Sequence, residues 1–239
     1  MQLNDDVYLV ALPIQHGGQT VYLNASLILD AINGPTLIDT GMPGQRDAIA
    51  TVLADAGVRV QDLKQIILTH QDIDHVGSLH DLVQASSARV LASAVETPCI
   101  DGSEPPRFTR PEVLAQRPEL RAAAAAFQPT PVDEQLQDGA RLDLAGGVRV
   151  IFTPGHTPGH MCLYHERSRT LIAGDALTSN DGQLMGPNEG ATPDMLTTAQ
   201  SVRKLAELDV QTIICYHGGA VTVGANEQLQ HVANELAQK

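Results

Sequence analysis

Four segments of the chain share one order: an apolar run of strand length ends, and a histidine or aspartate follows at once. They are QIILTHQDIDH at 65–75, RVIFTPGH at 149–156, TLIAGD at 170–175 and TIICYH at 212–217. In layered α/β proteins the carboxyl ends of strands meet at one edge of a sheet, where loops on a rigid scaffold form the functional site. We therefore expect the fold to bring these four strand ends, and their polar side chains, to one edge.

The rest of the chain predicts an α/β fold in two similar halves that face each other within one domain, residues 1–239. β-Branched or alternating runs predict the strands and helical spacing predicts the helices. Thr192 and Pro193 are typical of the N-cap and first turn of a helix. The predicted strands are 7–14, 20–29, 34–41, 65–70, 88–93, 141–153, 160–166, 169–175 and 210–217, and the predicted helices are 44–57, 75–86, 192–208 and 226–238.

Residues 94–139 are the least regular part of the sequence. The segment TPCIDGSEPPRFTRPE is rich in proline and typical of a loop, whereas LRAAAAAFQ favours a helix. We interpret this stretch as an insertion that covers a pocket, together with the loop at 178–192. The apolar residues of both segments would then favour a partly apolar small substrate: Phe108, Phe127, Leu184, Met185 and Pro187.

Composition excludes several classes of protein. The formal net charge is −13 and the 15 basic residues are scattered, which argues against a nucleic-acid partner. The cysteines, Cys99, Cys162 and Cys215, are too few and too far apart for a disulfide framework, and we expect them to be reduced core residues. We find neither an export signal nor a membrane-spanning run, so we expect a cytoplasmic protein without a membrane partner. The sequence leaves a homodimer open.

The polar residues at the strand ends resemble the pattern of the metallo-β-lactamase superfamily, whose motif is HxHxDH. The matching segment here is His70-Gln71-Asp72-Ile73-Asp74-His75, an HxDxDH variant. Further matches follow in the same order: His156 in TPGHTPGH, Asp175 in AGDAL, His217 in CYHGG and, earlier, Asp39 in the LIDTG turn. The resemblance covers about residues 20 to 220. It implies a four-layer αββα sandwich with two metal ions at one edge.

The resemblance also implies a role for each matching residue. One ion would be held by His70, Asp72 and His156, and the other by Asp74, His75 and His217, with Asp175 bridging both. Asp74 and Asp175 would take part in catalysis. A hydroxide between the ions would attack an electrophilic carbon or phosphorus atom, because bound divalent metals generate this nucleophile at neutral pH.

Asp72 departs from the family pattern, which has histidine at this position. Its carboxylate makes the ligand set one charge unit less positive than a set with a fifth histidine. We therefore expect weaker Lewis acidity and a shift toward harder ions. Zinc stays the first expectation, with iron, manganese or a mixed pair as alternatives.

Other histidines have less specific interpretations. His160 lies four residues after His156 and is expected either to line the pocket or to stabilise the turn, whereas Asp39 is expected in the turn rather than as a ligand. The remaining histidines, His16, His80, His165 and His231, are expected at the surface. A tyrosine in the loop after Asp175 could stabilise the oxyanion that forms on the substrate, but residues 176–192 contain no tyrosine. Tyr216 is the nearest candidate for this role.

The predicted function is hydrolysis of a small ester, lactone or thioester by a dinuclear metal site. Phosphodiester hydrolysis by the same site is the alternative reaction, and an inactive metal- or ligand-binding module is the non-enzyme alternative. A thioesterase that acts on glutathione conjugates is disfavoured, because the chain ends about twenty residues after His217.

Overall fold

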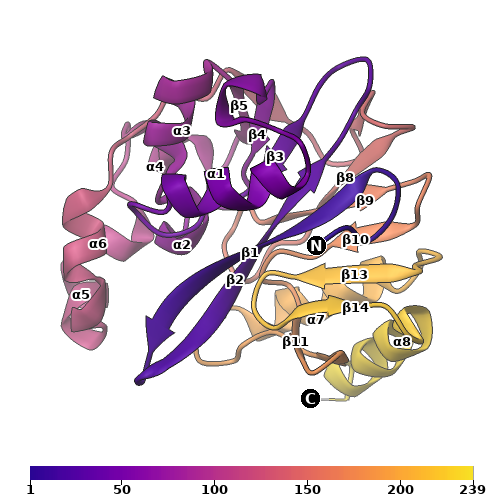
Figure 1. Ribbon diagram of the computed structural model, residues 1–239. Coiled ribbons are helices and arrows are strands. Elements are labelled where there is room, and N and C mark those ends of the chain that lie inside the picture. The colour runs from indigo at the N-terminus through magenta and orange to yellow at the C-terminus, as the bar shows by residue number, and fades with distance from the viewer. Residues whose placement is uncertain (239) are drawn as a thin grey trace.

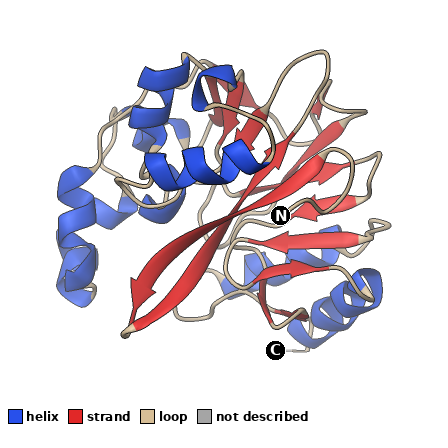
Figure 2. Ribbon diagram, in the orientation of Figure 1, coloured by secondary structure: helices blue, strands red, loops and turns tan. Residues whose placement is uncertain are grey.

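Two six-stranded sheets lie face to face in the computed structural model, and helices cover the outer face of each (Figures 1 and 2). The structure describes residues 1–238. This arrangement is the four-layer sandwich that the sequence predicts.

The first sheet contains its strands in chain order, β1 to β6. A long antiparallel hairpin, β1–β2, is followed by β3, β4, β5 and β6, and these last four strands run parallel to one another. The strands are β1 Val7–His16, β2 Gln19–Ile28, β3 Thr36–Ile38, β4 Gln65–Ile67, β5 Arg89–Ser93 and β6 Glu134–Leu136.

The second sheet has the order β14-β13-β10-β9-β8-β7, and only β10 and β13 pair in parallel within it. A separate hairpin, β11–β12, follows β10. The strands are β7 Arg141–Leu142, β8 Val148–Phe152, β9 Met161–His165, β10 Thr170–Ile172, β11 Thr178–Asn180, β12 Gln183–Met185, β13 Thr212–Cys215 and β14 Gly219–Val221.

The short apolar strands have two buried faces, and this explains their continuous hydrophobic runs. Successive side chains point to opposite faces, so Ile66 packs under the helices and Ile67 packs between the sheets. In the second sheet Ile213 likewise packs under the helices and Ile214 packs between the sheets. Three apolar layers therefore hold the four structural layers together.

Helices α1, α2 and α3 cover the first sheet, and α7 and α8 cover the second (Figure 1). Helices α4, α5 and α6 belong to the segment between β5 and β6. The α-helices are α1 Arg46–Asp55, α2 Ile73–Val76, α3 Leu79–Ser86, α4 Thr97–Asp101, α5 Pro111–Gln116, α6 Arg121–Ala126, α7 Met195–Leu205 and α8 Ala225–Leu236; the 3₁₀ turns are η1 Val60–Asp62, η2 Arg107–Thr109 and η3 Pro118–Leu120.

Two predicted helix boundaries are wrong. The helix predicted at 75–86 is divided into α2 and α3 at Gly77 and Ser78. A Cβ atom at Gly77 would meet the backbone of Met42 and Pro43, so close packing fixes a glycine there. The N-cap of α7 is Asp194, not Thr192, because the Asp194 carboxylate accepts a hydrogen bond from Thr197 N at 2.9 Å.

The register of the sheets brings the polar strand ends together. Ile38 pairs with Ile67, which places Asp39 beside the segment that begins at Leu68. Ile172 pairs with Ile214, which places Asp175 beside His217. The carboxyl ends of these parallel strands therefore meet at one edge of the sandwich.

Candidate metal centre

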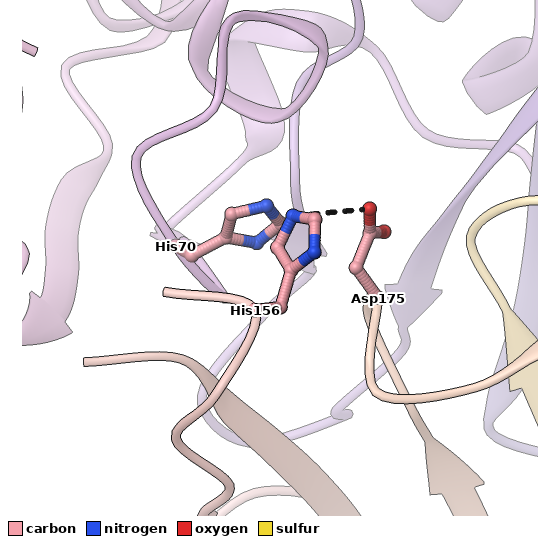
Figure 3. A group of neighbouring side chains, drawn as sticks. All are labelled: His70, His156 and Asp175. Atoms are coloured by element: carbon pink, nitrogen blue, oxygen red, sulfur yellow. Dashed lines mark ion pairs between the residues drawn. The ribbon is translucent and has the colours of Figure 1, made fainter. Parts of the chain in front are cut away.

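One group of possible metal ligands contains His70, His156 and Asp175, which follow β4, β8 and β10 (Figure 3). One ligand atom from each lies within 4.8 Å of the others. Nε2 of His156 lies 3.5 Å from Oδ2 of Asp175, and all three residues are buried.

A second group contains Asp74, His75 and His217. Nε2 of His217 lies 3.3 Å from Oδ2 of Asp74, and Nε2 of His75 lies 4.0 Å from the same oxygen. His75 is fully buried, whereas the His217 side chain is 39% exposed. The second group is therefore the one that opens toward solvent.

Asp175 lies between the two groups. Its Oδ1 atom is 3.2 Å from Nε2 of His75, and its Oδ2 atom is 3.5 Å from Nε2 of His156 and 3.3 Å from Nε2 of His217. One carboxylate thus faces ligand atoms of both groups, as a bridging residue must.

Asp72 lies beside the first group. Its Oδ2 atom is 3.2 Å from Nε2 of His156 and 3.8 Å from Nε2 of His70. The same oxygen accepts a hydrogen bond from the Arg107 guanidinium. All seven residues predicted as ligands therefore lie together, and Arg107 joins them from the segment between β5 and β6.

The seven residues fit divalent ions. Two ligand atoms bound to one tetrahedral ion at about 2.05 Å are about 3.3 Å apart, and the separations between the ring nitrogens and carboxylate oxygens here run from 3.2 to 4.0 Å. Four buried atoms at the site have no hydrogen-bond partner: Nε2 of His70 and His75, and Oδ1 of Asp72 and Asp175. Buried polar atoms normally have partners, and an ion bound between the two groups would give these four atoms theirs.

Nearby carboxylates shift the pKa values of two rings, those of His217 and His75, toward the charged form. Burial lowers the pKa of His217, but Asp175 and Asp74 outweigh burial and raise this pKa to about 10. The pKa of His75 is raised well above its usual value, because Asp39, Asp175 and Asp74 outweigh its burial. The cluster thus favours positive charge within it, which is the condition for binding cations.

Hydrogen bonds on the far side of the rings fix which nitrogen faces the site. Asp39 Oδ2 can only accept, so Nδ1 of His75, at 2.9 Å, is the donor. Thr69 Oγ1 donates to the same carboxylate at 2.8 Å and therefore accepts from Nδ1 of His70 at 3.0 Å. Both Nε2 lone pairs are left for an ion, and Asp39 supports the rings from the turn, as the sequence predicts.

His160 is a structural residue beneath the site. Its Nε2 atom accepts a hydrogen bond from the backbone N–H of Asp175 at 3.0 Å, so its other nitrogen carries the proton and lies 2.8 Å from Thr153 Oγ1. Burial lowers its pKa to about 3, which keeps the ring neutral. Of the two alternatives left open by the sequence, the structure shows the supporting role.

Tyr216 is not free to stabilise an oxyanion. It is buried, its hydroxyl donates to the backbone carbonyl of Asp74, and its ring stacks on His75 with centroids 3.7 Å apart. The residue therefore holds the second group in place.

Three residues that support the first group were not predicted from the sequence: Arg107, Glu96 and Gln71. Only Gln71 belongs to a motif; Arg107 and Glu96 lie in irregular segments that carry no positional signal.

The prediction of a surface position for His165 is wrong, since this residue is buried and its Nε2 lies 2.8 Å from the Ala145 carbonyl oxygen. The prediction for the cysteines is confirmed as to burial: Cys99, Cys162 and Cys215 are buried and unbonded to one another.

A family model described as the metallo-beta-lactamase superfamily matches residues 19–217. The chain belongs to the metallo-β-lactamase superfamily. The predicted membership, with its HxDxDH variant, is thereby confirmed, and so is the prediction of a hydrolytic enzyme at the level of the superfamily.

Two relatives whose names describe a hydrolase are similar to this chain over most of its length. The chain is 31% identical over 218 residues to a "Probable metallo-hydrolase YflN" of Bacillus subtilis, an alignment that covers 84% of this chain and 82% of that protein. It is 32% identical over 195 residues to a "Hydroxyacylglutathione hydrolase" of Cereibacter sphaeroides, covering 80% of this chain but 60% of the relative.

Solved structures show the same fold. A metallo-beta-lactamase family protein of Thermus thermophilus superposes with a TM-score of 0.75 at 28% identity, covering 99% of this chain and 80% of the other. A metallo-beta-lactamase from Pontibacter korlensis gives 0.73 at 16% identity, covering 100% and 98%, and this likeness concerns the fold alone.

The described residues contain no helix that is both long enough and apolar enough to cross a membrane. The cytoplasmic location stays a prediction.

Proposed function

We propose that the chain is a dinuclear metal-dependent hydrolase of a small ester, lactone or thioester. The observation that carries the proposal is the position of Asp175, whose two oxygens face ring nitrogens of both ligand groups. Zinc is the first candidate, and iron or manganese are alternatives suggested by Asp72. A dinuclear site would supply an activated water and polarise the substrate carbonyl.

The residues of the chain would divide the remaining work. Asp175 would hold the two ligand groups at a fixed separation, while the bonds from Thr69 and Asp39 keep the ring nitrogens aimed at the site. Asp74 has the most exposed of the three carboxylates, with 26% of its side chain accessible against 11% for Asp175. We assign to Asp74 the transfer of a proton from the attacking water to the leaving group, because it is the most solvent-accessible carboxylate of the site.

A cavity of about 440 Å³ beside the second group supports a partly apolar substrate. It lies between the β1–β2 hairpin and His217, and its lining is mostly apolar: Ala11, Ile14, Val21, Tyr22, Leu23, Asn24, His217 and Gly218. None of the five residues that the sequence suggested as pocket lining lines this cavity. Phe108 packs in the core of the first half and Leu184 in that of the second.

A thioester is one member of the proposed substrate class, and the hydroxyacylglutathione hydrolases among the relatives favour it. This chain spans only 60% of the length of that relative, so the likeness does not extend to the whole protein. The small volume of the cavity is compatible with an ester or lactone of similar size as well.

The proposal is tested with purified protein on p-nitrophenyl esters, lactones, thioesters and bis-p-nitrophenyl phosphate. We expect turnover in the carbonyl series and a loss of at least 10³-fold in Asp175→Asn, because both groups lose their shared ligand. Asp81→Asn, an exposed change on α3, is the matched control and should leave the rate unchanged. Turnover of the phosphodiester alone would favour the alternative reaction. No turnover of any compound would favour the non-enzyme alternative.

A further inference from the structure

Arg107 forms an ion pair with a predicted metal ligand. Its Nη2 atom donates to Oδ2 of Asp72, and its Nη1 atom donates to the carbonyl oxygen of His156 at 3.1 Å. The pair is only partly accessible, with 25% of the Arg107 side chain and 15% of the Asp72 side chain exposed. The guanidinium therefore joins Asp72 to His156, a member of the first group.

A backbone hydrogen bond fixes the position of Arg107 in addition to its ion pair with Asp72. Its backbone N–H donates to Gln71 Oε1 at 2.9 Å. The backbone and side-chain nitrogens of Gln71 both donate to Glu96 Oε2, at 3.0 and 2.9 Å, and Glu96 is fully buried. A chain of hydrogen bonds thus runs from a buried carboxylate through the HxDxDH segment to Arg107.

The ion pair changes the charge of the first group. Asp72 adds one negative charge beside His70 and His156, and Arg107 adds one positive charge on the same oxygen. Together they are formally equivalent to a neutral ligand. The shift in metal preference toward harder ions was expected from the charge of Asp72 alone. The positive charge of Arg107 opposes that shift.

We propose that Asp72 and Arg107 act as one unit, in which Arg107 compensates the charge of Asp72 so that the first group binds a divalent ion as it would with a neutral ligand. The inference rests on the proposed metal site. It has a specific consequence: neither residue can be replaced alone without changing metal binding, and replacing both together largely restores it.

The physical reason is the same for each single change. In Asp72→His, a partly buried guanidinium loses its carboxylate and faces the incoming cation, so zinc binding weakens. In Arg107→Met, Asp72 keeps its full charge, so binding shifts toward the harder manganese ion. In the double variant both charges are absent, and the histidine is a good zinc ligand.

The test measures zinc bound per chain against buffered free zinc for the wild type, Asp72→His, Arg107→Met and the double variant. We expect Asp72→His to bind zinc in the first group at least tenfold more weakly than the wild type. The double variant should return to within about threefold of the wild type. Arg110→Met removes an exposed arginine of the same segment and should not change zinc binding in either background.

Melting curves of the metal-free proteins show whether each variant folds. If Asp72→His does not fold, Asp72→Asn with and without Arg107→Met gives the same comparison, with coupling of the same sign expected. Equal zinc affinity of Asp72→His and the wild type would overturn the inference, as would an effect of Arg107→Met that is the same in both backgrounds. A wild type that binds no zinc, manganese or iron would contradict the proposed function too, whereas a metal-loaded wild type without coupling contradicts this inference alone.

Discussion

Nδ1 of His75 lies 2.9 Å from Oδ2 of Asp39, so the residue after β3 fixes the ring of a residue that follows β4. Asp39 is buried and has a φ of 62°, a conformation that aspartate and asparagine tolerate better than most residues. The contact depends on the parallel register of β3 and β4, which places these two strand ends side by side.

Replacing Asp39 by asparagine keeps the shape and the backbone preference but removes the negative charge. We expect metal affinity to fall about 10- to 100-fold, because the acceptor that orients His75 is weakened. Competition with a chromophoric chelator measures this change. Asp62→Asn, a change at a partly exposed residue outside both ligand groups, is the control, and equal affinity of Asp39→Asn and the wild type would show that Asp39 does not support the site.

Tyr216→Phe separates a structural role from a catalytic one. The variant loses the hydrogen bond to the Asp74 carbonyl but keeps the ring on His75. We expect a loss of about 1 kcal/mol in the free energy of unfolding and a kcat within about threefold of the wild type. If the hydroxyl stabilised an oxyanion, kcat would fall by about 10²- to 10³-fold, and denaturant unfolding together with steady-state kinetics distinguishes the two results.

Glu96→Gln tests the buried carboxylate beneath the first group. Glu96 accepts hydrogen bonds from Gln71 N, Gln71 Nε2 and Gly159 N, so an amide NH₂ there must face at least one donor. We expect a destabilisation of about 1–3 kcal/mol, which corresponds to a fall in Tm of roughly 2–12 °C. Glu207→Gln, at an exposed position, should melt like the wild type; a Glu96→Gln protein that also does so would rule out this role for the carboxylate.

The acid stability of the fold should depend on Asp30, far from the candidate metal centre. Burial raises its pKa, but hydrogen bonds from the backbone N–H groups of Ala145, Asn33 and Ile32 outweigh it and lower the pKa from 3.8 to about 2. A lowered folded pKa stabilises the protein above pH 3.8, and this contribution disappears as the pH falls through about 2.

Asp30→Asn should therefore be less stable than the wild type by about 1 kcal/mol at pH 6, a figure reduced for solvent screening, and equally stable near pH 2. Urea unfolding at several pH values measures the difference. Asp55→Asn, at an exposed position of α1, should show no such trend. A difference for Asp30→Asn that does not change with pH would refute the account of its carboxylate.

The layered fold and the gathering of His70, Asp175 and His217 could be predicted from sequence, because apolar strands with polar ends have few other arrangements. The parallel pairing of β10 with β13 then places Asp175 next to His217 without further information. The local sequence pattern therefore predicts those features of the fold that depend on the period and direction of the strands.

Features that depend on packing between distant segments could not be predicted. The break between α2 and α3 falls at Gly77 and Ser78, where a Cβ atom on Gly77 would meet the Met42–Pro43 backbone, and His165 is buried beside the turn that contains Ala145. Arg107 comes from a proline-rich segment without periodicity, so only the folded chain shows that it reaches Asp72. Its contact is the one that most changes the interpretation of the site.

The most direct measurement for the whole account is the metal content of protein purified without chelators, determined by elemental analysis. We predict close to two equivalents of divalent metal per chain in the wild type and at most one in Asp175→Asn, because Asp175 faces both ligand groups. Less than half an equivalent in the wild type after incubation with zinc, manganese or iron would contradict it.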